Sequence, residues 1–275
     1  MRIVSPISSL FTAFPSSTGP VQFLGGPFCF GQKAENHCHC MGERPVRTAS
    51  DLWTARFMIW ENEGWKNLLQ ERGSQMNEQY FEKLLNISTA GYQMGYPKSS
   101  HYHRYEPTPY EALEQLFEDY ELPEKATVVD FGCGKGRVPI YLHHTFQVPV
   151  VGIEMDDKFF LEAMNNRTTY LQKARKRLIP ITFLHMLAEE YEVTAQDNVF
   201  FFFNPFSVQI FRTVLMNILW SFEQHPRDIH LLLYYPAPDY LQYLQYETNF
   251  DLLAEVRLRG HRNENERICV FRLEW

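Results

Sequence analysis

VVDFGCGKGR, residues Val128 to Arg137, lies near the middle of the 275-residue chain. Its apolar run ends in Asp130, three glycines follow at alternate positions, and a stretch with helical character comes next. Glycines in such a loop permit a tight turn and let a ligand approach the backbone closely. Ligands of α/β proteins lie beyond the carboxyl ends of the strands, so this stretch predicts a nucleotide site at the end of a buried strand.

Beyond Lys125, apolar runs alternate with helical patterns. The predicted strands are 126–132, 148–155, 179–186, 198–206, 228–236, 250–258 and 266–275. The first five are apolar throughout, which is typical of strands covered on both faces, and no helix separates the last two. The fold class is therefore α/β: a doubly wound, mostly parallel seven-stranded sheet with an antiparallel C-terminal hairpin, preceded by a helical segment.

The chain divides into three parts by composition. Residues 1–50 are rich in Pro, Ser and Gly and contain no acid before Glu35, so we expect a disordered or loosely attached lead. Residues 51–104 place apolar side chains among Glu, Lys, Arg and Gln, and we expect a helical cap there. Residues 105–275 hold the predicted sheet.

Composition limits the class of protein. The net charge is −7 and the pI about 5.8, which disfavours bulk attraction to nucleic acid. No apolar run approaches the roughly 20 residues that cross a bilayer, so we expect no membrane span. Five cysteines without a disulfide framework favour a reducing compartment, and we expect the protein in the cytoplasm. His37 to Cys40 are metal-ligand types that stand too close together to share one ion, so we expect no metal site.

The spacing Asp130-x-Gly132-x-Gly134-x-Gly136 departs from the G-x-G-x-x-G pattern of dinucleotide sites. It resembles motif I of the class I S-adenosylmethionine (SAM)-dependent methyltransferases, and the resemblance covers about 105–275. This resemblance implies SAM as the cofactor and 105–275 as a SAM-binding methyltransferase domain. It also implies that Asp130 orders the loop and contacts the amino-acid end of SAM, while the glycines face the methionine and ribose.

Two further acids follow the next predicted strands. The second strand ends in Glu154 and Met155, and a carboxylate there can accept hydrogen bonds from both ribose hydroxyls. The resemblance gives this role to Glu154. The alternative is a solvated acid that starts a helix, which better describes Asp156 and Asp157 as caps of the following helix. After the third strand, Glu189 stands near the position of an adenine contact, and the alternative is an exposed helix start.

The fourth strand ends in Asn204-Pro205-Phe206. This resembles the Asn-Pro-Pro-Tyr/Phe motif of amino-group methyltransferases, in which the Asn side chain and a backbone carbonyl accept hydrogen bonds from the target amino group and the aromatic ring stacks on it. One proline is missing here, so an adenine target does not carry over. The alternative is an Asn-Pro turn that ends the strand, with Phe206 in the core.

Upstream, 105–110 resembles the Thr-Pro segment that precedes motif I in several of these enzymes, which implies that Thr108 lies near the cofactor carboxylate. Thr108 and Glu111 also have the spacing of a capping box. Aromatic rings beside a sulfonium stabilise its charge by about 0.5–2 kcal/mol, and Tyr105, Phe131 and Phe206 are the candidates.

The predicted function is SAM-dependent methylation of a nitrogen on an undetermined acceptor, which could be a small molecule, a protein or RNA. The basic helix end Lys173 to Arg177 allows an RNA contact, although cations there also offset the helix dipole. The alternative function is a non-catalytic nucleotide-binding or interaction module with the same fold. The glycine spacing disfavours a nicotinamide oxidoreductase, and no pattern in the sequence sets the oligomeric state.

Overall fold

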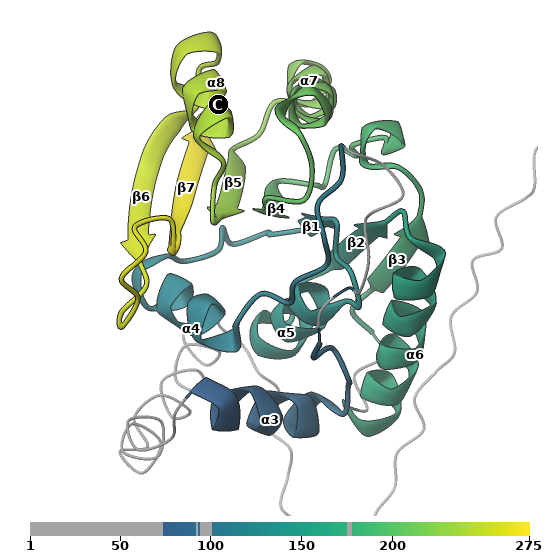
Figure 1. Cartoon of the computed structure of the whole chain (residues 1–275). Helices are drawn as coiled ribbons and strands as arrows, with labels where there is room; N and C mark the ends of the chain where they lie inside the picture. The colour runs from purple at the N-terminus through teal and green to yellow at the C-terminus, as the bar shows by residue number, and fades with distance from the viewer. Residues whose placement is uncertain (1–73, 92, 94–100, 175–177) are drawn as a thin grey trace, which may run out of the picture. The chain divides into compact units, whose positions relative to one another are not determined.

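One seven-stranded sheet forms the centre of the protein (Figure 1). The computed structural model describes residues 74–91, 93, 101–174 and 178–275. The strands are β1 (Val128–Phe131), β2 (Val150–Glu154), β3 (Ile181–His185), β4 (Val199–Phe203), β5 (Ile229–Tyr234), β6 (Asp251–Arg257) and β7 (Arg267–Leu273). Their order in the sheet is β3-β2-β1-β4-β5-β7-β6, in which β1 to β5 are parallel and β7 is antiparallel to both of its neighbours. This confirms the predicted doubly wound sheet and the C-terminal antiparallel hairpin.

Helices cover both faces of the sheet (Figure 1). They are α3 (Ser74–Leu85), α4 (Tyr110–Asp119), α5 (Arg137–Phe146), α6 (Asp157–Ala174), α7 (Val208–Gln224) and α8 (Pro238–Glu247), with a 3-10 turn η1 (Ala188–Glu190). Alternate residues of β4 point to opposite faces: Phe201 packs with the cluster under α4, α5 and α6, whereas Phe200 and Phe202 pack with α7 and α8. Burial on both sides explains why the strands are apolar throughout.

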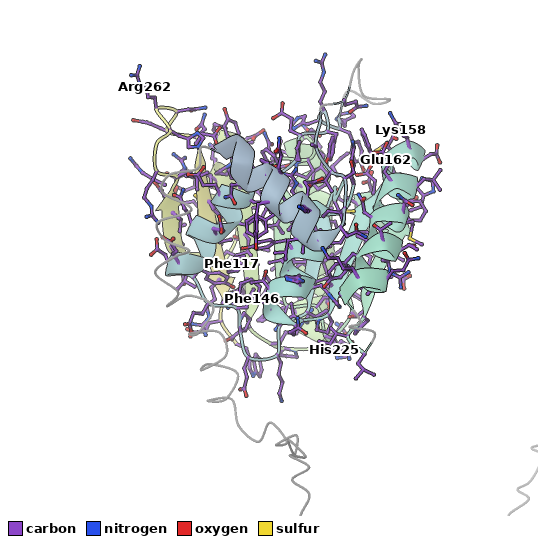
Figure 2. All side chains as sticks on the ribbon, turned by 90° about the horizontal axis from the view of Figure 1, so that it is seen from below. Phe117, Phe146, Lys158, Glu162, His225 and Arg262 are labelled. Atoms are coloured by element: carbon purple, nitrogen blue, oxygen red, sulfur yellow. The ribbon has the colours of Figure 1, made fainter. Side chains whose placement is uncertain are left out.

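Aromatic rings join neighbouring helices on the first of these faces. Figure 2 shows this side, where Phe117 of α4 and Phe146 at the end of α5 lie close together, with their ring centroids 4.4 Å apart. Phe81 of α3 stacks on Tyr110 of α4 at 4.6 Å and meets Tyr141 of α5 edge to face at 5.6 Å. Helix α3 is therefore packed onto the sheet domain as a further layer.

The strand order reverses at β1, which places a crevice at the carboxyl ends of β1, β2 and β4. Phe131 pairs in register with Ile153 of β2 and with Phe202 of β4. The glycine loop, Glu154 and Asn204 consequently leave the sheet at one edge, beside the topological switch point where doubly wound sheets hold their ligands.

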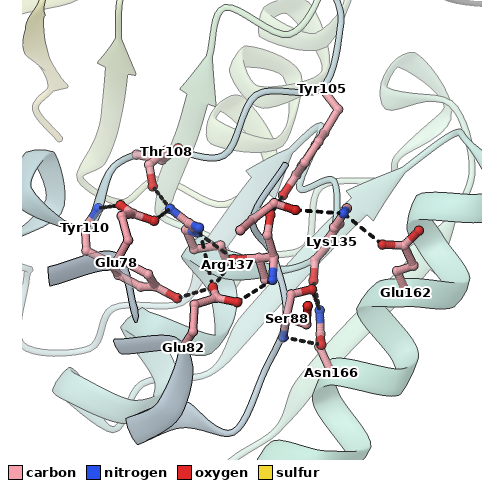
Figure 3. A network of polar contacts seen from close by, with 12 residues as sticks. Glu78, Glu82, Ser88, Tyr105, Thr108, Tyr110, Lys135, Arg137, Glu162 and Asn166 are labelled. Carbon is pink, nitrogen blue, oxygen red and sulfur yellow. Dashed lines mark hydrogen bonds and ion pairs between the residues drawn. The ribbon is translucent and has the colours of Figure 1, made fainter. Parts of the chain in front are cut away.

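A buried arginine ties α3 to the glycine loop (Figure 3). Arg137 is the first residue of α5 and is only 2% exposed. Its guanidinium lies 2.5 Å from a carboxylate oxygen of Glu78 and 3.4 Å from one of Glu82, and these two glutamates stand one helical turn apart on α3. The same guanidinium donates to the Thr89 hydroxyl at 2.6 Å and to the Thr108 carbonyl at 3.0 Å.

The start of α4 depends on this network. Glu78 accepts the backbone N–H of Tyr110 at 3.1 Å, and Glu82 accepts its hydroxyl at 3.1 Å. The helix begins after Pro109 without a side-chain cap, so the predicted capping box of Thr108 and Glu111 is wrong. A carboxylate from α3 satisfies the amide that a local cap would otherwise bind.

Several sequence predictions fall on residues that the structure does not describe. These are the lead at 1–50, the cluster His37 to Cys40, most of 51–104 and the basic residues 175–177. Within the described part of 51–104 there is one helix, α3, and the division into three parts stays a prediction. Lys173 donates to the Lys83 carbonyl at 2.8 Å. In the described ranges, no helix has the length and apolar character that crossing a membrane requires.

Arg137→Gln should lower the free energy of unfolding by about 3 kcal/mol, because it leaves two mostly buried glutamates without their cation. Denaturant unfolding followed by circular dichroism measures this. The matched control is Arg259→Gln, since the Arg259 side chain is 69% exposed and pairs with Glu118 at the surface; a change of less than about 1 kcal/mol is expected there. Equal effects of the two substitutions would contradict a structural role of the buried network.

Candidate functional site

A cavity of about 290 Å³ lies at the carboxyl ends of β1, β2, β4 and β5. This is near the lower end of the range for small-ligand sites. Of the residues predicted from the sequence, the cavity is lined by Tyr105, Thr108, Asp130, Gly132, Glu154, Met155, Asn204 and Pro205. The lining does not include Phe131, Gly134, Gly136, Glu189 or Phe206. The structure thus brings the acid, the loop and the Asn-Pro pair to one place.

Glu154 fastens the glycine loop to the end of β2. One carboxylate oxygen accepts the Gly134 N–H at 2.8 Å, and the other accepts the Asp156 N–H at 2.7 Å. Burial raises the pKa of Glu154, and these two backbone hydrogen bonds act against that rise. Each oxygen keeps a lone pair for a ligand, since a carboxylate offers about four acceptor positions. Asp156 accepts the amides of Lys158 and Phe159, which confirms it as the cap of α6.

Asp130 lies in the same cavity and is 4% exposed. Burial, and then the charge of Glu154, raise its pKa well above the usual 3.8. Two carboxyl groups at one cavity favour a ligand that carries positive charge and N–H or O–H donors, because such a ligand offsets the desolvation of both.

Side chains from other parts of the protein pack directly against the three motif glycines. Gly132, Gly134 and Gly136 have φ of +79°, +54° and +83°. A Cβ on Gly134 would overlap the Tyr105 ring, and one on Gly132 would lie 2.7 Å from Cβ of Pro205. A Cβ on Gly136 would lie 2.6 Å from the Phe183 ring. The backbone turn therefore needs glycine, and the side chains of Tyr105, Pro205 and Phe183 pack against the loop. Contact of the three glycines with a cofactor stays a prediction.

Tyr105 lines one side of the cavity. Figure 3 shows its side chain among the polar contacts around Lys135 and Arg137. Its ring packs on Phe159 with centroids 4.7 Å apart, and the Lys135 ammonium lies 5.3 Å from its centroid. The hydroxyl donates to the Thr89 carbonyl at 2.5 Å, and burial raises its pKa. Thr89 also binds Arg137, so the wall belongs to the same network that holds α3.

Asn204 leaves the end of β4 with φ of +40°. Its side-chain oxygen is buried and has no hydrogen-bond partner within the part of the chain that the structure describes. The backbone carbonyls of Asn204 and Pro205 accept from the His103 ring at 2.6 Å and from the His103 N–H at 2.9 Å. A buried polar group without a hydrogen-bond partner lowers the stability of the fold by about 1–3 kcal/mol. A bound acceptor that donates an N–H to the Asn204 oxygen would remove this cost.

The ring of Phe206 does not reach the cavity. Phe206 is 1% exposed and meets Phe202 and Tyr102 edge to face, with centroids 6.2 and 5.8 Å apart. Phe131 is likewise 1% exposed and stacks on Phe202 at 5.2 Å. Both rings fill the core between the sheet and α7, as the alternative interpretation of Phe206 holds.

Glu189 also stands outside the cavity lining. Its carboxylate accepts the Tyr102 hydroxyl at 2.7 Å, and burial together with Glu189 raises the pKa of Tyr102. The neighbouring Ala188 lines the cavity instead. Tyr102 lies across the cavity rim because it forms an antiparallel bridge with Phe206.

Sequence reasoning missed several lining residues, including Phe203 and Tyr235. Phe203 and Tyr235 have a signal that could have found them, since they end β4 and directly follow β5, where side chains reach the ligand edge of the sheet. His103 and His101 lie in the segment HYHRY, where the sequence leaves open a histidine that gates the acceptor pocket or one exposed to solvent. His103 lies at the cavity through pairing with Pro205, which is 102 positions away along the chain.

The chain has low sequence identity to the known proteins that it resembles in structure. No protein-family model matches the chain, and no curated protein matches its sequence. Among solved structures it is similar to an RNA methyltransferase from Salinibacter ruber in complex with S-adenosyl-L-homocysteine (SAH), with 21% identity, 61% of this chain and 92% of that one covered, and a TM-score of 0.40. It is also similar to the human methyltransferase 10 domain containing protein, with 11% identity, 73% and 95% covered, and a TM-score of 0.48. A third is magnesium protoporphyrin IX methyltransferase from Synechocystis with bound SAM, with 11% identity, 58% and 74% covered, and a TM-score of 0.40.

Gly134→Ala should destabilise the protein more than Gly260→Ala. Both glycines have positive φ, +54° and +84°, so both variants carry about 1–2 kcal/mol of backbone strain. Only at Gly134 does the new methyl group meet a buried ring, whereas nothing lies within 4 Å of it at Gly260. Overpacking adds about 1–3 kcal/mol, measured as the difference between the two unfolding free energies. No difference would mean that Tyr105 does not pack on the loop.

Asp130→Asn should become more stable relative to the original protein as pH rises. The folded state holds the Asp130 proton more tightly than the unfolded state, so ionisation weakens the fold as pH rises from about 4 through the raised pKa. Asparagine does not ionise, and its advantage in melting temperature grows over that interval. Thermal unfolding at a series of pH values checks this, with the exposed Asp119→Asn as the control. A difference that shrinks with pH would contradict the buried position of Asp130.

Proposed function

We propose that the protein is a SAM-dependent methyltransferase that transfers the methyl group to a nitrogen atom. The observation that carries this is the pair of buried carboxyl groups, Asp130 and Glu154, at the switch point beside a glycine loop. SAM is a cation with an ammonium group and two ribose hydroxyls, so its charge and donors complement these acceptors. The residues present therefore fit the cofactor that the motif implies.

In this proposal, Glu154 and Asp130 bind the cofactor on one side of the cavity and Asn204 binds the acceptor on the other. Glu154 would accept the ribose hydroxyls while it keeps the loop amide of Gly134, and Asp130 would lie near the ammonium end. Tyr105 closes one side of the cavity against water, which strengthens the electrostatic interactions inside it. On the other side, Asn204 would accept an N–H of the acceptor and aim its lone pair.

SAM supplies an activated methyl group: the acceptor lone pair forms the new N–C bond as the C–S bond breaks, which leaves neutral SAH and releases one proton from nitrogen to water. Alignment and exclusion of water are then the main tasks of the protein. A strong base is not needed, because the amide of Asn204 holds the amino group without removing its proton.

Calorimetric titration with SAM and SAH tests the proposal, followed by transfer of a labelled methyl group into total RNA, protein and small-molecule fractions. We expect binding of both ligands and label in one fraction. Absence of binding to either ligand would overturn the proposal and leave the non-catalytic module. Binding without transfer to any fraction would overturn the catalytic part of the proposal.

Two substitutions should separate cofactor binding from turnover. Glu154→Gln should weaken SAM binding by about 10- to 100-fold, because a neutral amide replaces a charged acceptor. Asn204→Ala should keep SAM affinity within about twofold and lower turnover by about 100-fold, as the loss of one positioned polar group does. Calorimetry and labelled-methyl rates measure the two effects, with the exposed Glu192→Gln as the control. Equal losses of affinity in both variants would contradict this division.

A further inference from the structure

Tyr235 directly follows β5 and has φ of +49°. A bulky residue in the left-handed region is an outlier, and such strain gathers at functional sites because the surrounding structure must hold it in place. Two contacts to the C-terminal hairpin do so here. The Tyr235 N–H donates to the Arg267 carbonyl at 3.0 Å, and the hydroxyl accepts from the Asn263 amide at 3.0 Å.

Tyr235 and Asn204 are neighbours at the cavity. Phe203 of β4 and Tyr234 of β5 are paired in register, so Asn204 and Tyr235 are the next residues on two adjacent parallel strands. Both have positive φ and both line the cavity. Adjacent strands lie about 4.8 Å apart, so a group bound to the Asn204 amide is within reach of the Tyr235 ring.

Phe206 is buried in the core, and the aromatic residues that line the cavity near Asn204 are Tyr102, Phe201, Phe203 and Tyr235. Among these, Tyr235 is the residue beside Asn204 on the adjacent strand. We propose that Tyr235 is the stacking platform for the acceptor, in the role that the motif would give to Phe206. This inference rests on the proposed methyltransferase function and makes it more specific. The acceptor is then a planar ring with an amino group, which stacks on Tyr235 while Asn204 accepts one of its N–H groups.

Direct binding of small probes tests this in the SAH-loaded full chain. Saturation-transfer NMR is recorded with adenosine and cytidine, which carry ring amino groups, with inosine, which lacks one, and with Nα-acetyl-lysine amide, which is aliphatic. We expect transfer to adenosine or cytidine, less to inosine and none to the lysine derivative. Equal or stronger transfer to the lysine derivative would overturn the proposal.

Substitutions at Tyr235 then separate the ring from the rest of the site. Tyr235→Phe should keep the binding of the planar amine, and Tyr235→Ala should weaken it by about tenfold, as the loss of one stacked ring does. Tyr235→Gly removes the ring and also relieves the positive φ, so it should lose the probe while its melting temperature rises above that of Tyr235→Ala. The control is Tyr246→Ala, at a tyrosine that is 73% exposed on α8. Unchanged probe binding in Tyr235→Ala and Tyr235→Gly would overturn the proposal.

The inference and the proposed function fail in different ways. If SAH binds in calorimetry and planar probes bind without regard to Tyr235, the stacking platform is wrong and the methyltransferase proposal stands. If SAH does not bind and planar probes still depend on Tyr235, the ring platform stands and the methyltransferase proposal is wrong.

Discussion

The charge of Arg137 is the constraint on which the rest of the structure depends. This residue ends the glycine loop and begins α5, and its guanidinium lies out of contact with water. A buried cation must be neutralised, and both carboxylates that do so, Glu78 and Glu82, come from α3. The helix that precedes the sheet in the sequence is thereby connected to the cavity wall, because Thr89 accepts a hydrogen bond from the same arginine and from the hydroxyl of Tyr105. The packing of α3 and the shape of the loop therefore depend on the same buried charge.

Several groups at the cavity lower the stability of the folded protein. Asp130 and Glu154 lose solvation on folding, and the charge of Glu154 adds to the cost of ionising Asp130. At the same edge of the sheet, the side-chain oxygen of Asn204 lacks a hydrogen-bond partner among the described residues. The backbones of Asn204 and Tyr235 both have positive φ, which is a strained conformation for residues other than glycine. A cationic ligand with hydrogen-bond donors would offset part of this unfavourable free energy. Sites with many acceptors and a strained backbone are therefore expected where a protein binds a ligand rather than in its packed core.

The local sequence pattern was enough to predict the strands and the stretch of helical character after the glycine loop, which is α5, because both depend on neighbours in sequence. The acid at the end of β2 lies at the cavity, where parallel-strand geometry puts it, and its contact with a cofactor stays a prediction. The pattern is less informative where a distant partner decides the contacts of a residue. Thr108 does not cap α4, since Glu78 satisfies the Tyr110 amide, and Glu189 is taken by Tyr102. Phe206 follows a motif position, yet the turn at Asn204 directs its ring into the core.

The position of β7 has a consequence for how the chain folds during synthesis. This strand is made after β6 but lies between β5 and β6, so β6 has no neighbour in the sheet until β7 has left the ribosome. Leu252 and Leu253 of β6 are about half exposed even in the finished sheet. The nascent protein therefore passes through a stage in which the backbone groups of β6 are unpaired and Leu252 and Leu253 are exposed beside them, which is when this strand is most open to pairing with another chain.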